Sequence, residues 1–207
     1  MKRVNNLLIP AIIATVTTLL ALGGGTARGA GPWYVSTTGN DGSDCLSPGT
    51  ACLTIQAAIN KASAGDAVNV AAGSYNEQVQ INKTLSLLGA QAGVDARTRI
   101  TASESIIDHT CGPVQIMADK VVLDGFTVQG SEDSDPCFLA GIWTNPGYSG
   151  TQGGHNILNN IVQNNISGLE LDNVGSFPTA VKFNLFKNNS NPGNGSQHNF
   201  GPSYPFG

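Results

Sequence analysis

Two carboxylates in the last third of the chain have the spacing of a catalytic pair. Glu170 and Asp172 alternate with Leu169 and Leu171, so a strand here would carry both carboxylates on one face. Paired carboxylates can act as acid and base on a glycosidic bond. Such pairs are more often only solvated polar side chains on the outside of a strand, and both interpretations stay open.

Three further carboxylates, those of Glu132, Asp133 and Asp135, lie together just before Cys137. Calcium takes six to eight oxygen ligands, so this loop is a candidate calcium site. The spacing differs from that of the twelve-residue calcium loop, and a hydrated acidic loop is the alternative.

Trp143 and Tyr148 flank an Asn-Pro-Gly turn. Aromatic side chains on an exposed loop can stack on sugar rings, and they can equally cover an apolar interior. Asp108 and His109 resemble part of a nucleophile-activating set, but the chain has no Gly-x-Ser-x-Gly turn to supply the nucleophile. We expect His109 to be a turn residue beside Cys111.

Charge and composition limit the class of partner. The chain has 207 residues, a formal charge of −4 and only 12% charged residues. Phosphate-binding surfaces need an excess of Lys and Arg, so nucleic acid is excluded as the main partner. The low charged content also disfavours a coiled coil.

Residues 1–27 have the pattern of a secretory signal peptide. Lys2 and Arg3 precede an apolar run from Leu7 to Leu22, and small residues follow up to Ala27, after which we expect cleavage. The run falls short of the roughly 20 residues that span a bilayer. The sequence therefore predicts a secreted or cell-surface protein with no membrane span after cleavage.

Export would place the four cysteines in an oxidising compartment, where disulfides form. Cys45 and Cys52 flank a Ser-Pro-Gly turn, which favours a local bridge and leaves Cys111 with Cys137. Four cysteines allow three pairings, so this pairing is a preference.

One helix and a series of short strands must position these residues. Ile55 to Ala62 has a single apolar stripe, with Thr54 as a candidate N-cap and Gly65 as the stop. The β-rich runs after the helix are separated by turns of Gly, Asn and Asp. These runs are Ala67–Val70, Gln78–Ile81, Leu85–Leu88, Val114–Met117, Val121–Val128, Gly141–Thr144, Asn156–Gln163, Gly168–Leu171 and Ala180–Lys187.

Internal repeats connect these strands. Asn156–Asn165 aligns with Ala180–Asn189 at an offset of 24, and Val121–Gly130 aligns with Asn156–Asn165 at an offset of 35. In the second alignment Gly125 falls on Asn160, which indicates a corner with left-handed backbone. Stacked coils would bring Asn160 and Asn184 within hydrogen-bonding distance, as a ladder. A β-solenoid is therefore predicted, with a β-sandwich of hairpins as the alternative.

The quoted segments resemble a known superfamily. The run from Tyr34 to Gly42, the run from Thr54 to Ile59 and the run from Gly65 to Tyr75 are similar to the start of secreted right-handed parallel β-helix proteins of the pectin-lyase-like superfamily. The resemblance implies an all-β fold, a right-handed parallel β-helix (solenoid) over residues 31–190 with a short N-terminal capping helix. Residues 191–207 are rich in Gly and Pro and are expected to form a flexible tail.

The resemblance implies less about activity. Related hydrolases carry Asn-Thr-Asp, Asp-Asp and Gly-His-Gly, none of which occurs here, and related lyases use a basic residue beside bound calcium. Arg97 and Arg99 precede the clear repeats, and Lys182 has apolar neighbours in the alignment. We therefore expect a non-catalytic domain that contacts polysaccharide, with no cofactor unless calcium binds.

Two rival hypotheses stay open. The first is a polysaccharide lyase or glycoside hydrolase that acts on acidic polymers through Glu170, Asp172 or Lys182. The second is a structural or adhesive piece that associates end to end.

Overall fold

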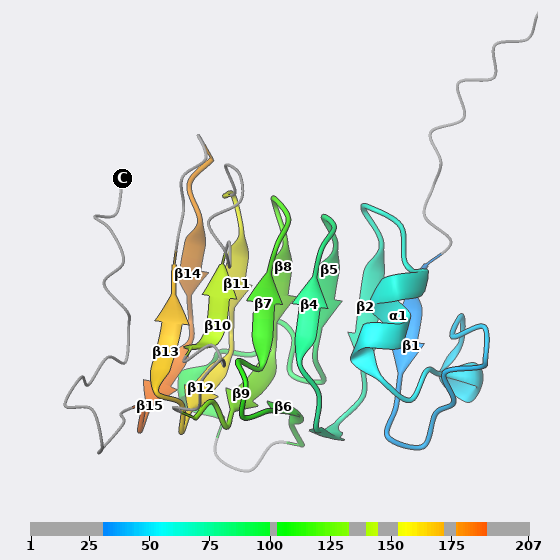
Figure 1. The fold of residues 1–207 in the computed structure, drawn as a ribbon, viewed down its shortest axis with the longest axis horizontal. Coiled ribbons are helices and arrows are strands. Elements are labelled where there is room, and N and C mark those ends of the chain that lie inside the picture. Colours follow the sequence, from blue (N-terminus) through cyan, green and yellow to red (C-terminus); the bar gives the residue numbers. More distant parts are fainter. Residues whose placement is uncertain (1–30, 100–102, 133–139, 145–152, 172–176, 190–207) are drawn as a thin grey trace, which may run out of the picture.

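The computed structural model describes residues 31–99, 103–132, 140–144, 153–171 and 177–189 (Figure 1). The predicted signal peptide and tail lie outside these residues. The described chain is mostly β-structure in three sheets, with one α-helix.

Sheet A contains β1 (Trp33–Val35), β2 (Ala67–Val70), β5 (Ser86–Leu88), β8 (Val122–Asp124), β11 (Asn156–Leu158) and β14 (Ala180–Lys182). Sheet B contains β3 (Gly73–Tyr75), β6 (Ser105–Asp108), β9 (Phe126–Gln129), β12 (Ile161–Gln163) and β15 (Leu185–Lys187). Sheet C contains β4 (Val79–Ile81), β7 (Val114–Ile116), β10 (Ala140–Thr144) and β13 (Ser167–Glu170).

The chain visits the three sheets in rotation. From β2 onwards, successive strands belong to sheets A, B and C in turn, and each strand pairs with the strand three later in the chain. Every strand pairing in the described part of the chain is parallel. The alternative of a sandwich built from antiparallel hairpins is therefore wrong. The arrangement is compatible with a parallel β-helix.

The core lies between the three sheets because alternate side chains of each strand point inward. In sheet A the inward position carries Val68, Leu87, Leu123 and Ile157, all fully buried and in register with one another. Sheets B and C contribute further buried apolar residues such as Val128 and Ile142. Stacking like residues on like positions gives one continuous apolar interior.

The repeat with an offset of 24 is confirmed, because Ile157 pairs with Val181 and Ile161 with Leu185. The offset of 35 is wrong by one position. Ile157 pairs with Leu123, 34 residues earlier, so Gly125 corresponds to Asn159 and not to Asn160. The left-handed corners are accordingly Gly125, Asn159 and Phe183 after sheet A, and Gly130, Asn164 and Asn188 after sheet B.

The asparagines next to these corners form the predicted ladder. The Nδ2 of Asn160 donates to the Oδ1 of Asn184 at 3.2 Å, as expected. A second ladder links Asn165 to Asn189 at 3.1 Å. Each of these asparagine side chains also donates to a backbone carbonyl of the strand that precedes it in the sheet order. In addition, the N–H of Phe126 donates to the Oδ1 of Asn160 at 3.0 Å. The ladders thus satisfy buried backbone groups where the strands are interrupted.

Helix α1 (Ile55–Lys61) contacts β1, β2 and β4 and lies at the β1 end of the molecule (Figure 1). The Thr54 cap is confirmed, because its Oγ1 accepts the N–H of Ala57 at 3.2 Å. The predicted stop at Gly65 is wrong, since the C-cap is Ala62. Gly65 instead has a φ of +92°, in the turn that leads to β2.

Strand bounds also differ from those predicted. Three long runs, Val121–Val128, Asn156–Gln163 and Ala180–Lys187, are each two strands separated by a corner. Two strands, β3 and β6, were not expected from the sequence. Two short 3₁₀ helices, η1 (Pro48–Thr50) and η2 (Ala96–Thr98), complete the described elements.

The predicted Cys45–Cys52 disulfide is confirmed and closes the loop that carries η1. Cys111 is disulfide-bonded as well. Its preferred partner, Cys137, lies outside the described residues, so that pairing stays a prediction. The observed disulfide is typical of an oxidising, extracellular compartment.

Candidate functional site

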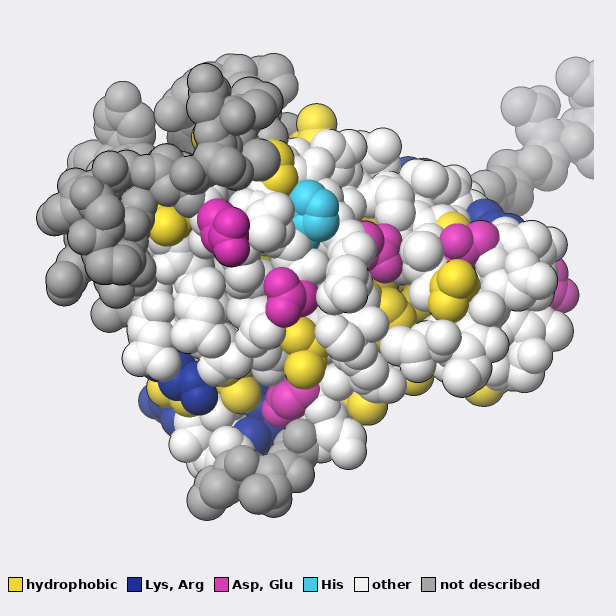
Figure 2. Space-filling view, turned by 60° about the horizontal axis from the view of Figure 1, so that its bottom comes forward, with side chains coloured by type: hydrophobic (Ala, Val, Ile, Leu, Met, Phe, Trp, Pro, Cys, Tyr) yellow, Lys and Arg dark blue, Asp and Glu magenta, His cyan; other side chains and the backbone are white. Residues whose placement is uncertain are grey.

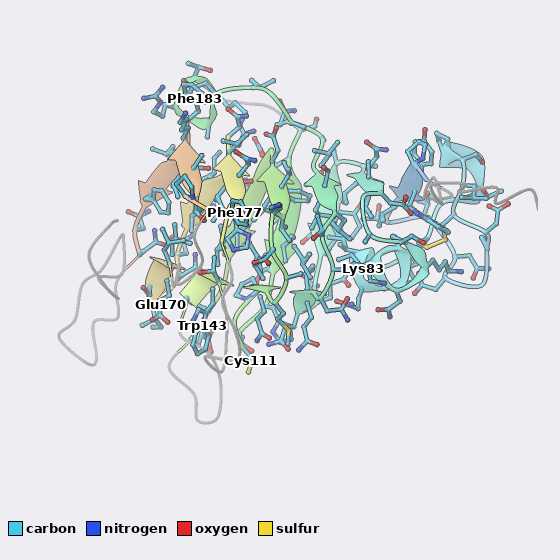
Figure 3. All side chains as sticks on the ribbon, turned by 90° about the horizontal axis from the view of Figure 1, so that it is seen from above. Lys83, Cys111, Trp143, Glu170, Phe177 and Phe183 are labelled. Carbon is cyan, nitrogen blue, oxygen red and sulfur yellow. A yellow bond between two sulfur atoms is a disulfide. The ribbon has the colours of Figure 1, made fainter. Side chains whose placement is uncertain are left out.

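The outer side of sheet C carries a row of polar and aromatic side chains. Gln80, Gln115, Trp143 and Glu170 occupy the same register position on β4, β7, β10 and β13. The strand neighbours Val114 and Ile116 are fully buried in the core. Alternation along each strand therefore turns the four polar and aromatic side chains to the opposite side. Figure 3 shows Trp143 and Glu170 next to each other along one side of the molecule.

Gln115 is the unusual member of this row. Only 2% of its surface is exposed, and its Oε1 accepts the Nε2 of Gln80 at 3.3 Å. Its own Nε2 is buried and has no hydrogen-bond acceptor among the residues that the structure describes. A buried donor without an acceptor costs about 1–3 kcal/mol. The side chain of Gln115 therefore has an unpaired hydrogen-bond donor beside Trp143, its neighbour across the β7–β10 pairing.

The row has the chemistry of a site for hydroxyl-rich rings. Trp143 is partly buried and has an aromatic ring, and Gln115 beside it has a buried amide N–H. Glu170 is partly buried and adds a carboxylate that accepts hydrogen bonds. The row contains no Lys or Arg.

The structure separates the residues of the rival catalytic set. Glu170 points to the outside of sheet C, as the alternation predicted, whereas Lys182 is exposed on β14 of sheet A. Asp172 lies outside the described residues. Glu170 and Lys182 therefore belong to different sheets, and the pairing of Glu170 with Asp172 stays a prediction.

The calcium prediction stays untested. Glu132 is exposed and its N–H donates to the carbonyl of Thr110 at 2.8 Å. Asp133 and Asp135 lie outside the described residues, as does Tyr148 of the proposed aromatic pair. Within the described ranges, no three His, Cys, Asp or Glu side chains are placed to hold a metal ion. Figure 2 shows acidic side chains scattered singly over the visible face, some of them beside Lys or Arg side chains.

Two histidine regions serve the fold. The Nδ1 of His109 accepts the N–H of Cys111 at 3.0 Å, which is the turn role expected for it. His155 is fully buried, and its Nδ1 accepts the N–H of Val121 at 3.4 Å. Burial lowers the pKa of His155 to about 4, with a smaller opposing effect of Asp119.

Sequence reasoning missed Gln80 and Gln115, although a signal was present. The tripeptide Val-Gln-Ile occurs at 79–81 and again at 114–116, and these two copies pair residue for residue. A repeated polar residue between two core residues indicates a row on the outside of a sheet.

Comparisons with known proteins add no assignment to this geometry. No helix of the described residues has the length and apolar character to cross a membrane. No family model, curated protein or solved structure matches the chain.

Proposed function

We propose that the chain is an exported, right-handed parallel β-helix of the pectin-lyase-like kind that binds a neutral polysaccharide through the outer row of sheet C. The rotation of the chain through three parallel sheets supports the fold. The Cys45–Cys52 disulfide supports export, because disulfides persist in oxidising compartments.

The observation that carries the proposal is the unpaired side-chain N–H donor of Gln115 beside Trp143. A sugar presents C–H faces that stack on an aromatic ring and hydroxyl oxygens that accept N–H groups. Because Nε2 of Gln115 is itself buried, a sugar hydroxyl would reach it only once the groups that cover it move aside, and the new bond would then remove the cost of the unpaired donor.

Charge favours a neutral polymer. Glu170 is part of the row, the chain has a formal charge of −4, and the row has no cation. A polyuronate would place its carboxylates against Glu170, which like charges disfavour.

Binding fits the described residues better than cleavage. A lyase or hydrolase needs its acid and base around one glycosidic bond. Glu170 and Lys182 lie on different sheets, and within the described residues no second carboxylate is placed beside Glu170 on its strand. New reducing ends or unsaturated products from pectin or alginate would establish the enzyme instead.

Glycan-array binding of the protein tests the proposal. We expect binding to neutral glycans that weakens at least about tenfold in Trp143→Ala, since aromatic anchors dominate binding energy. Phe183→Ala is the control, because Phe183 is an exposed aromatic residue at a corner after sheet A. No binding to any glycan, or equal binding by Trp143→Ala, would refute the assignment. Repeating the array with a calcium chelator tests the calcium prediction for Glu132, Asp133 and Asp135.

A further inference from the structure

A hollow lies on sheet A, away from the row on sheet C. Its volume is about 360 Å³, within the usual range for ligand pockets. It is formed at the β1 end of the sheet by strands β1, β2 and β5, the turns that follow them, and the disulfide-closed loop. The lining residues are Tyr34, Val35, Ser36, Pro48, Ala51, Asn69, Val70, Ala71, Leu88, Gly89 and Ala90.

The floor of this hollow is a row of outward side chains. Tyr34, Asn69 and Leu88 are in register on three neighbouring strands, and each is partly buried. The residues that follow β2 and β5 are Ala71, Gly89 and Ala90, which are too small to fill the space. Pro48 and Ala51 form a wall, and the Cys45–Cys52 disulfide closes the loop that carries them.

The polar side chains of the hollow are uncharged, and two of the three are available, since the hydroxyl of Ser36 already bonds Thr38. None of the lining residues is Asp, Glu, Lys, Arg or His. Within the ranges that the structure describes, neither the phenol of Tyr34 nor the side-chain amide of Asn69 has a hydrogen-bond partner. The site therefore offers an aromatic face, an O–H and an amide that both donates and accepts.

This combination selects against other ligand classes. Phosphates and carboxylates need a cation or a group of backbone N–H donors, and no cation lines the hollow. An extended peptide would need a free strand edge. Strand β1 has none, because β2 occupies one side and the loop with Cys45 and Cys52 bonds the backbone of Tyr34 on the other.

We propose that the hollow binds one neutral pyranose unit, with Tyr34 against the ring face and Asn69 on its hydroxyls. This site goes beyond the proposed function, since it lies on a different sheet and does not depend on Trp143. A polymer that binds at sheet C would meet a second contact here only if it wraps around the molecule.

The test is an NMR titration of the ¹⁵N-labelled protein with hexasaccharides of β-1,4-glucose, α-1,4-glucose, β-1,4-xylose and β-1,4-mannose. At least one should shift the side-chain amide of Asn69 and the backbone of Ser36 in a saturable manner. Tyr34→Ala should weaken this binding at least about tenfold, as loss of an aromatic anchor does. Tyr34→Phe keeps the ring face and should retain most of the affinity.

Two control variants distinguish binding in the hollow from binding elsewhere on sheet A or on sheet C. Leu158→Ala changes the same outward row of sheet A beyond the hollow and should leave the titration unchanged. Trp143→Ala should also leave it unchanged, whatever becomes of binding at sheet C. Absence of Asn69 shifts with all four sugars would overturn the proposal. So would shifts that Trp143→Ala abolishes, or saturation by hexagalacturonate alone.

Discussion

Replacement of Asn160 by Ala tests the role of the asparagine ladder most directly. Asn160 is fully buried, its Oδ1 accepts the N–H of Phe126 at 3.0 Å, and its Nδ2 donates to the carbonyl of Leu123 at 3.0 Å. Alanine removes both bonds as well as the bond from Nδ2 to the Oδ1 of Asn184, and it leaves the buried N–H of Phe126 without its acceptor.

The magnitude follows from this one N–H group. A buried donor left unpaired costs about 1–3 kcal/mol, so we expect the free energy of unfolding to fall by about that amount. The N–H of residue 160 still reaches the Oδ1 of Asn184, as it does now at 2.7 Å. The loss is therefore expected on the Phe126 side of the ladder.

Urea unfolding followed by circular dichroism gives the change, from the midpoint and the slope of the transition. Asn156→Ala is the matched control, because Asn156 is exposed on β11 of the same segment. Surface changes of this kind stay within about 0.5 kcal/mol. Should the two variants unfold at the same urea concentration, the ladder would contribute nothing net and our reasoning would fail.

Three other changes probe stability by different means. Burial lowers the pKa of His155 to about 4 from 6.5. The neutral His155 therefore stabilises the fold fully above pH 6.5, and this contribution is lost as the pH falls towards 4. His155→Asn should flatten this pH dependence of the free energy of unfolding, measured between pH 4 and 7. Gly125→Ala should cost far more than Gly65→Ala in the same assay. Both glycines have positive φ, but a Cβ at Gly125 would meet backbone at 2.1 Å whereas Gly65 faces open space. Replacing both Cys45 and Cys52 by Ala leaves the Cys111 disulfide intact and should lower the free energy of unfolding in the same assay by about 2 kcal/mol, the entropy of closing a short loop.

Local patterns predicted the elements well because each is defined by its own residues. The stripe and cap of α1 lie within eight positions, and the alternation in runs such as Ala67–Val70 matches the burial of β2. Strands β3 and β6 escaped prediction because they are short and partly polar, and because pairing with neighbouring strands makes them strands.

Register was harder to predict than element type. Two adjacent valines, Val121 and Val122, fit the alignment almost equally well one position apart, so the offset of 35 was plausible. The hydrogen bond from Phe126 to Asn160 fixes the true register, and it depends on a side chain 34 positions away.

The site itself depends on topology more than on sequence. Glu170 and Lys182 lie 12 positions apart in the chain, yet the rotation through the sheets places them on different sides of the molecule. Gln80 and Trp143 are far apart in the chain and share one row. Only the repeated Val-Gln-Ile tripeptide marks Gln115, because an amide has no reactivity of its own.

The parallel order of the strands also has a mechanical consequence. The bonds between neighbouring strands run along the order of each sheet, which follows the long axis of the molecule (Figure 1). Tension along that axis would pull on these hydrogen bonds along their own direction, so the bonds between one pair of neighbouring strands could break before those of the next pair. Tension along the strands would shear several bonds at once, so the molecule should resist stretching least along its length.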